Sequence, residues 1–199
     1  ATSKDVAASI TPRVVTLSAS KTYDGTAALS GSQVSIGNLV GSETLTYSGA
    51  AANDALVGTA NKFIQTITLG DGTNGGLVSN YQLPNLNAAN AGVTIAAATL
   101  TPSLSNTGVT KVYDGTTNSS ITPTYTFSGL VSGDTSASLT NTSQAYDTSN
   151  VSTASKVTVF GLSINSITGT IGSLSSDYVL SATSKDVAAS ITPRVVTLS

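Results

Sequence analysis

The chain has 199 residues, of which 39% are apolar and 9% are charged, and its formal net charge is −2. Apolar residues are plentiful and about a third of the chain is Ser or Thr, so the composition favours folded β-strands over a charge-solvated disordered segment. The scarcity of Lys and Arg excludes a basic nucleic-acid footprint, the absence of Cys excludes disulfides, and no apolar run is long enough to span a membrane.

The two ends of the chain carry the same sequence. Residues 1–18 read ATSKDVAASITPRVVTLS, and residues 182–199 repeat all of it at an offset of 181 positions (182 − 1). We interpret this as one period of a perfect tandem repeat plus an overlap, in a longer array. Residues 1–12 are then the last strand of a preceding module, and residues 194–199 the first strand of the next.

Between these ends, short alternating segments predict β-strands separated by Gly, Asn and Asp turns. In a first module we expect strands at 14–18, 33–39, 44–48, 62–69, 79–83 and 91–99. In a second we expect them at 110–113, 121–128, 136–140, 156–163, 165–171, 176–181 and 185–192. The pattern favours an all-β fold of tandem Ig-like antiparallel β-sandwich modules arranged end to end.

Three prolines, Pro12, Pro102 and Pro193, recur at offsets of 90 and 91 residues, so we place the module junctions there. Module A is then 13–102 and module B is 103–193. No Gly/Ser linker lies at either junction, and proline restricts the backbone around it. We therefore expect little hinge freedom between modules.

The hexapeptide Lys-x-Tyr-Asp-Gly-Thr occurs at 21–26 and again at 111–116. We interpret it as a structural turn in which Tyr packs on the sandwich edge, Asp caps the turn, and Gly adopts a left-handed conformation. The alternative is that Asp24 and Asp114 bind a cation or a ligand. The residues assigned to this turn motif are Lys21, Tyr23, Asp24, Gly25, Lys111, Tyr113, Asp114 and Gly115.

Other candidate sites have simpler structural explanations. Residues 70–76 (GDGTNGG) resemble part of a calcium loop but lack its acidic density, so a hairpin loop is favoured. Thr122, Thr124 and Thr126 share one strand face, as in an ice- or crystal-binding surface, although exposed strands are rich in Thr anyway. Asn118, Asn141 and Asn150 match the glycosylation acceptor pattern, which a Ser/Thr-rich chain produces by chance.

The side chains of most enzyme mechanisms are missing. The chain has no His and no Cys, one Glu, no evident carboxylate pair and no Gly-x-Ser-x-Gly motif. We therefore expect no enzyme activity, no catalytic residue, no cofactor and no metal.

Four segments of module B together resemble a known repeat: Lys111–Thr117, Gly129–Asp134, Lys156–Val159 and Asp177-Tyr178. They are similar to the YDG-type repeat of large bacterial surface adhesins of the filamentous-haemagglutinin type, which are exported by two-partner secretion. Module A matches more loosely, mainly at 21–26. The resemblance implies an extracellular, Ig-like stalk without catalytic residues, although the β-helical segments of those adhesins are absent from this chain.

These observations predict a structural stalk or fibre segment of a repetitive bacterial cell-surface or secreted adhesin, of the kind that supports biofilms. The expected partners are adjacent identical repeats of the same chain and, through self-association, other fibres. Two alternatives stay open: a multivalent module that binds carbohydrate or another surface, and a filament subunit assembled by strand exchange.

Overall fold

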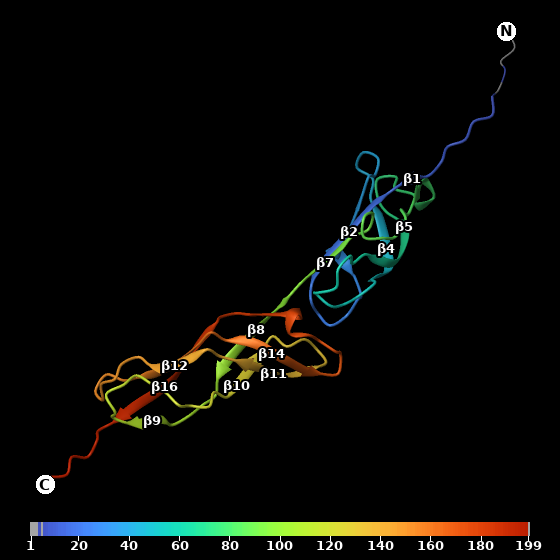
Figure 1. Cartoon of the computed structure of the whole chain (residues 1–199). Coiled ribbons are helices and arrows are strands. Elements are labelled where there is room, and N and C mark those ends of the chain that lie inside the picture. The colour runs from blue at the N-terminus through green and yellow to red at the C-terminus, as the bar shows by residue number, and fades with distance from the viewer. Residues whose placement is uncertain (1–3, 5, 199) are drawn as a thin grey trace. The chain divides into compact units, whose positions relative to one another are not determined.

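The computed structural model describes residue 4 and residues 6–198, which divide into two compact units (Figure 1). Unit 1 ends at Ala96 and unit 2 begins at Ala97. The described residues contain no α-helix, and 46% of the chain is strand. The prediction of an all-β fold is therefore confirmed.

Unit 1 is built from seven strands and two short 3₁₀ turns. They are β1 (Arg13–Val14), β2 (Thr16–Thr22), η1 (Gly31–Gln33), β3 (Val34–Gly37), β4 (Leu45–Ala52), β5 (Ile64–Asp71), η2 (Val78–Asn80), β6 (Tyr81–Gln82) and β7 (Val93–Ala96). One sheet has the order β3-β2-β7, while β4 pairs with β5 and β1 with β6.

Unit 2 repeats this plan with more strands. They are β8 (Ala98–Leu104), β9 (Val109–Val112), β10 (Tyr125–Ser128), β11 (Asp134–Thr140), β12 (Ser143–Tyr146), β13 (Lys156–Phe160), β14 (Ser163–Gly169), η3 (Ser175–Asp177), β15 (Tyr178–Leu180) and β16 (Ser184–Thr192). The sheets have the orders β12-β13-β16-β9 and β10-β8-β15, with β11 paired to β14.

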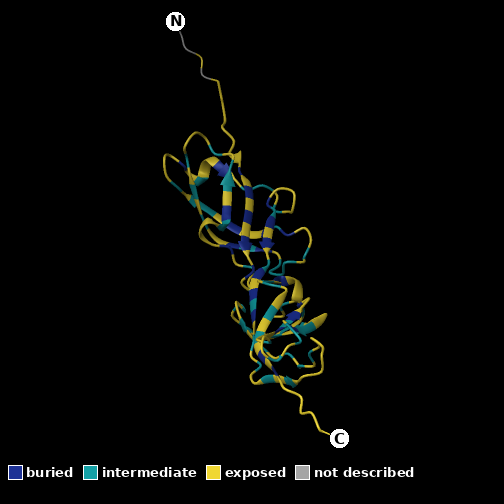
Figure 2. Ribbon diagram, turned by 90° about the vertical axis from the view of Figure 1, so that its left-hand side faces the viewer, coloured by how far each residue is buried: buried dark blue, intermediate teal, exposed yellow. Residues whose placement is uncertain are grey.

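Alternation along the strands sets which side chains are buried, because successive residues of a strand point to opposite faces. In β2, Leu17, Ala19 and Lys21 are buried between exposed Ser and Thr. Figure 2 shows the resulting bands of buried and exposed residues. The most buried apolar residues of unit 1 are Val15, Ile64 and Ala91; those of unit 2 are Leu100, Val157 and Val159. Fully burying a Val, Leu or Ile side chain contributes about 1.5–3 kcal/mol each.

Each unit also contains parallel strand pairs, which accompany the expected antiparallel ones. The second strand of each unit meets its last strand in this way: β2 pairs with β7, and β9 with β16. Near the start of each unit, β1 pairs in parallel with β6, and β8 with β15. Parallel neighbours require a long crossover, and here nearly the whole unit forms that connection.

The division of the chain differs from the predicted boundary after Pro102. The segment 91–99, expected as one strand, is two strands on either side of Ala97, where the chain passes from unit 1 to unit 2. Pro102 is fully buried within β8, opposite Phe127. It therefore lies inside unit 2, whereas Pro12 directly precedes β1 and Pro193 directly follows β16.

The difference arises from an insertion in unit 2. Arg13 and Ala98 are equivalent, since each pairs with the tyrosine that begins the parallel partner strand, Tyr81 or Tyr178. From Arg13 to Tyr23 is 10 positions (23 − 13), but from Ala98 to Tyr113 it is 15 (113 − 98). The extra residues form the break between β8 and β9, where unit 1 has the continuous strand β2. Pro12 and Pro102 therefore lie at the same distance from the turn motif, but not at the same distance from the start of the unit.

Two further details were not expected. Strand β12 (Ser143–Tyr146) was not predicted, because its sequence SQAY lacks a clear apolar alternation. Residues 6–12 and 193–198 form no strand in this structure, although 184–192 forms β16 with the sequence that residues 3–11 share. Of the predicted terminal segments, residues 1–3, 5 and 199 lie outside the described part of the chain.

Candidate functional site: the lysine-centred turns

The first Lys-x-Tyr-Asp-Gly-Thr motif begins on β2 and continues into the turn that follows it. Because β2 alternates, Lys21 points inward, and its side chain is only 1% exposed. A buried ammonium is costly unless its three N–H donors have partners. The turn supplies those partners.

The Lys21 ammonium lies at the centre of the turn. Its Nζ is 2.6 Å from Asp24 Oδ1 and donates hydrogen bonds to the carbonyl oxygens of Thr26 (3.0 Å) and Ala28 (2.9 Å). The same Asp24 oxygen accepts from the Thr26 N–H and hydroxyl, both at 2.9 Å. Gly25 has φ of 81°, a left-handed value that a residue with a side chain rarely adopts.

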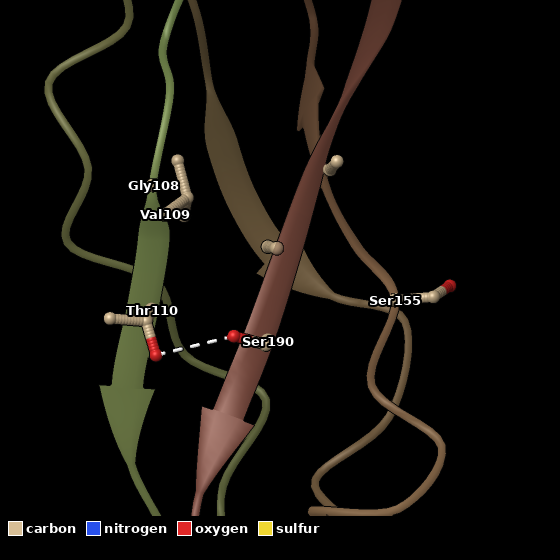
Figure 3. Close-up of a pocket in the computed structure, with 7 residues that line it drawn as sticks. Gly108, Val109, Thr110, Ser155 and Ser190 are labelled. Carbon is tan, nitrogen blue, oxygen red and sulfur yellow. Dashed lines mark hydrogen bonds between the residues drawn. The ribbon is translucent and has the colours of Figure 1, made fainter.

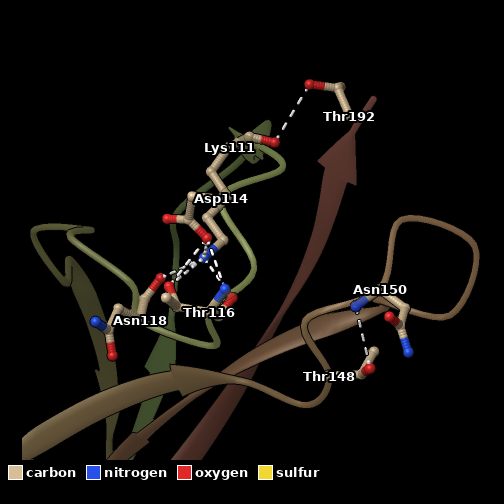
Figure 4. A network of polar contacts seen from close by, with 7 residues as sticks. All are labelled: Lys111, Asp114, Thr116, Asn118, Thr148, Asn150 and Thr192. Atoms are coloured by element: carbon tan, nitrogen blue, oxygen red, sulfur yellow. Dashed lines mark hydrogen bonds and ion pairs between the residues drawn. The ribbon is translucent and has the colours of Figure 1, made fainter. Parts of the chain in front are cut away.

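The second motif forms the same network (Figure 4). Lys111 Nζ donates to Asp114 Oδ1 at 2.8 Å and to the carbonyl oxygens of Thr116 (2.7 Å) and Asn118 (3.0 Å). Thr116 donates to Asp114 through both its N–H and its hydroxyl, and Gly115 has φ of 77°. The two motifs are therefore equivalent in backbone geometry and in polar contacts.

The network shifts the acidity of both aspartates. The hydrogen bond from Lys111 is the main cause that lowers the pKa of Asp114 to about 2, with further contributions from Thr116. For Asp24, burial raises the pKa, but the hydrogen bonds from Lys21 and Thr26 outweigh burial, and the net pKa lies below 3.8. Both carboxylates are therefore ionised at neutral pH and paired with a lysine.

The tyrosines of the two motifs lie in different surroundings. Tyr23 is buried at 3% exposure, whereas Tyr113 is 40% exposed. In unit 2 a buried aromatic comes instead from Tyr146, whose ring centroid lies 5.1 Å from Lys111 Nζ, within cation–π range. The equivalent position in unit 1 is Ala52, since the N–H groups of Ala52 and Tyr146 bond to equivalent carbonyls, at residues 27 and 117.

Each motif is also joined to the last strand of its unit. The Tyr23 N–H donates to the Ala96 carbonyl at the end of β7, and the Tyr113 N–H donates to the Thr192 carbonyl at the end of β16, both at 2.8 Å. The Thr192 hydroxyl also donates to the Lys111 carbonyl, at 3.2 Å (Figure 4). The turn therefore links the second strand, the last strand and the following loop.

The chemistry of this arrangement fits a structural turn. The lysine ammonium already binds the carbonyl oxygens that would have to coordinate a cation in this turn. It also forms the ion pair with the aspartate, so the carboxylate needs no second positive charge. In the part of the chain that the structure describes, no three His, Cys, Asp or Glu side chains come close enough to hold a metal ion.

A second polar contact recurs in both units, and the sequence patterns did not predict it. Tyr81 donates its hydroxyl hydrogen to Glu43 at 2.5 Å and accepts from the Val40 N–H at 2.9 Å. In unit 2, Tyr178 binds Asp134 and the Val131 N–H at 2.5 and 3.0 Å. The hydrogen bond to Glu43 is the main cause that raises the pKa of Tyr81. We call these pairs the tyrosine latches.

The other sequence candidates are engaged in local structure. In the 70–76 loop, Asp71 accepts the Val78 N–H at 2.7 Å, and the Asn74 side chain donates to the Ser42 carbonyl at 2.9 Å. Thr124 accepts a hydrogen bond from the Ser105 hydroxyl at 3.0 Å. Of the prolines, Pro12 and Pro193 flank strands, and Pro102 is buried in β8.

The surface hollows differ in the side chains that line them: one includes Arg13 and Glu43, another includes Lys62, and a third has no ionisable group. The third (Figure 3) lies beside β9 and β16 and is lined by Gly108, Val109, Thr110, Ser155, Ala188, Ala189 and Ser190. Its polar groups are hydroxyls and backbone atoms, and the Ser190 hydroxyl already donates to Thr110 at 3.3 Å. It contains no titratable side chain.

The fold and the repeated turn define an all-β protein made of tandem modules with one shared turn. The YDG domain family matches the chain twice, at residues 6–91 and 95–185. These matches cover most of the chain, which therefore belongs to the YDG domain family. Comparison with curated proteins and with solved structures found no match. No helix among the described residues is long and apolar enough to cross a membrane.

Proposed function

We propose that the chain is a structural segment of a long, repetitive fibre at a bacterial cell surface, which spaces an adhesive tip from the cell. The observation that carries this proposal is the identity of residues 1–18 with 182–199. An exact copy of this length at a 181-residue offset points to a tandem array, and arrays of compact modules typically act as extended scaffolds.

The sites described above support the proposal, because their polar groups are used within each unit. Lys21 and Lys111 bind their own turns, and the tyrosine latches join residues about forty positions apart in one unit. The resemblance of the sequence motifs to adhesin repeats is the ground for proposing an extracellular location and adjacent repeats as the main partners.

Immunogold electron microscopy of the native cell surface tests the proposal directly. An antibody against the 70–76 loop, which occurs once per period, should label thin surface fibres at regular intervals. Antibody saturated with a peptide of the same loop is the control. Label confined to the cell interior, or to surfaces without fibres, would contradict the proposal.

A filament assembled by strand exchange is the second candidate, and the N-terminal copy of the β16 sequence supplies the strand that it would need. Ile191 in β16 is 3% exposed, while Ile10, which occupies the same place in the identical N-terminal copy, is 100% exposed. Residues 6–11 therefore carry the sequence of a sheet strand without a sheet. The matching position in a second copy's unit 2 is held by that copy's own β16, so strand exchange requires β16 to leave it.

Light scattering at increasing protein concentration separates the two candidates. Strand exchange predicts oligomers that disappear in Ile10→Asp, because a buried charge in the exchanged strand is unfavourable. Thr11→Asp is the control, since the equivalent Thr192 is exposed. A monomer at all concentrations would contradict strand exchange and leave the covalent array.

A further inference from the structure

The second strand and the last strand of each unit are neighbours that run in the same direction. In unit 1, β2 pairs with β7 from Ala19↔Val93 to Thr22↔Ala96. In unit 2, β9 pairs with β16 from Val109↔Ala189 to Val112↔Thr192. The chain enters each unit ahead of the first strand of this pair and leaves it at the end of the second.

This arrangement determines how a pull along the chain acts on each unit. Tension draws the first strand back towards its own start and the last strand forward past its own end. Because the two strands are parallel and adjacent, they are drawn past one another, and all the hydrogen bonds between them are loaded together. If both strands were pulled from the same end, the bonds would break one at a time.

The lysine-centred turn lies where sliding of the first strand must begin. The last bond of the pair is made by the motif tyrosine, from the Tyr23 N–H to the Ala96 carbonyl. Two residues before it, Lys21 reaches forward to the carbonyls of Thr26 and Ala28. For β2 to slide backwards, its buried lysine must leave these partners at the same time.

We infer that β2–β7 and β9–β16 are shear clamps that carry tension through each unit, and that the lysine-centred turn is the stop that prevents the first strand from sliding. The use of such a clamp by the cell rests on the proposed fibre function. Its mechanics belong to each unit and are measurable on the isolated chain.

Single-molecule pulling on the full chain tests the clamp, and the absence of cysteine allows handles at chosen residues. Pro12→Cys with Ala96→Cys loads unit 1 in shear. Thr22→Cys with Ala96→Cys keeps one handle and loads the same strand pair from one end, because Thr22 and Ala96 are opposite each other. Each unfolding event in shear should lengthen the tether by roughly 30 nm, at about 3.5 Å per residue.

We expect unfolding of unit 1 at a given force to be at least about tenfold slower in shear than from one end, since forced unfolding follows the unfolding rate. Equal rates, or faster unfolding in shear, would overturn the clamp. This comparison keeps Lys21 and its whole network in place, so it does not depend on whether a lysine variant folds.

The stop is tested with two buried lysines of unit 1. Lys21→Met removes the ammonium from the turn. The control Lys62→Met removes an ammonium that donates to the carbonyls of Leu56, Val57 and Thr59 at 2.6–2.8 Å, none of which belongs to β2 or β7. It leaves in place the Lys62 backbone carbonyl, which accepts from the Val93 N–H at the start of β7. Lys21→Met should speed unfolding in shear about tenfold, as the loss of a charge-assisted hydrogen bond allows.

Lys62→Met should change the rate in shear much less, whatever its effect on unfolding by denaturant. An equal acceleration by Lys62→Met would overturn the stop, because the effect would then be general destabilisation. A strong clamp in a protein that immunogold microscopy places inside the cell would contradict the fibre but not the clamp. A weak clamp in a protein that forms labelled surface fibres would contradict the clamp but not the fibre.

Discussion

The two lysine-centred turns share their backbone and polar contacts but differ in what covers them. The Lys21 side chain is 1% exposed and its neighbour Tyr23 is buried, whereas the Lys111 side chain is 16% exposed and Tyr113 is 40% exposed. The constant part of the motif is thus the ammonium, the aspartate and the glycine. The aromatic cover is variable, and unit 2 provides it from Tyr146 on another strand.

The largest difference is expected at the motif tyrosines. Tyr23→Ala should lower the free energy of unfolding of unit 1 by about 3–4 kcal/mol, because it removes a buried aromatic ring. Tyr113→Ala should cost unit 2 about 1 kcal/mol, since this tyrosine is 40% exposed and loses less buried area than Tyr23. Hydrogen exchange of the full chain, which follows each unit separately, measures both; equal losses would mean that exposure does not decide the role of this tyrosine.

Replacing the motif lysine should also destabilise unit 1 more than unit 2, but by a smaller difference than replacing the tyrosine. Lys21→Met leaves Asp24 and two carbonyls without their buried partner and should cost unit 1 about 3 kcal/mol. Lys111→Met should cost unit 2 about 1 kcal/mol, because the Lys111 side chain is 16% exposed and water screens its ion pair. The same exchange measurement applies, and Lys111→Met as the more damaging change would reverse the comparison.

The tyrosine latches should behave alike, since their contacts are the same in both units. Tyr81→Phe and Tyr178→Phe each remove one hydroxyl that joins a carboxylate to a backbone N–H. Each should lower the Tm of its unit by roughly 5 °C. Calorimetry of the full chain provides the test, and an effect in one unit alone would show that the latches are not equivalent.

The smallest effect is the dependence on acid. The pKa of Asp114 is about 2 in the folded protein and 3.8 without its partners, so the carboxylate binds protons more weakly when folded. It therefore stabilises unit 2 above about pH 4, and this contribution is lost as the pH falls from about 4 to 2. Asp24 should act in the same direction in unit 1.

Urea midpoints between pH 6 and pH 2 measure this loss, with Asp114→Asn as the variant that lacks the titrating group. The difference in urea midpoint between the parent protein and Asp114→Asn should become smaller as the pH falls through this range. A difference that stays constant down to pH 2 would show that the Lys111–Asp114 pair does not contribute to folding.

Sequence patterns were sufficient for the fold class and for the location of the turns. Alternating residues and recurring Asp-Gly pairs are local signals, and they mark strands and turns directly. The central role of Lys21 was missed, because a lysine in an alternating strand does not reveal which carbonyls the following loop will present. The boundary at Pro102 differed because spacing alone does not show where an insertion lies.

The tyrosine latches depend on contacts between distant parts of the chain. Glu43 and Tyr81 lie 38 positions apart, and Asp134 and Tyr178 lie 44 apart. The sequence contained a signal in the joint recurrence of Leu-Val-x-x-acid and Tyr-x-Leu in both modules. Recurrence shows that both segments are needed, but only the fold brings the two side chains together.

The parallel pairing of the second and last strands also sets the order of events during synthesis. The contacts of Lys21 reach at most seven residues ahead, so the turn closes as soon as residue 28 is available. Its partner strand β7 begins some seventy residues later, at Val93. Each unit must therefore wait for its final strand, with one edge of β2 unpaired. In a growing array only the most recently synthesised unit would lack its last strand. Every unit made before it could already have paired its last strand and folded.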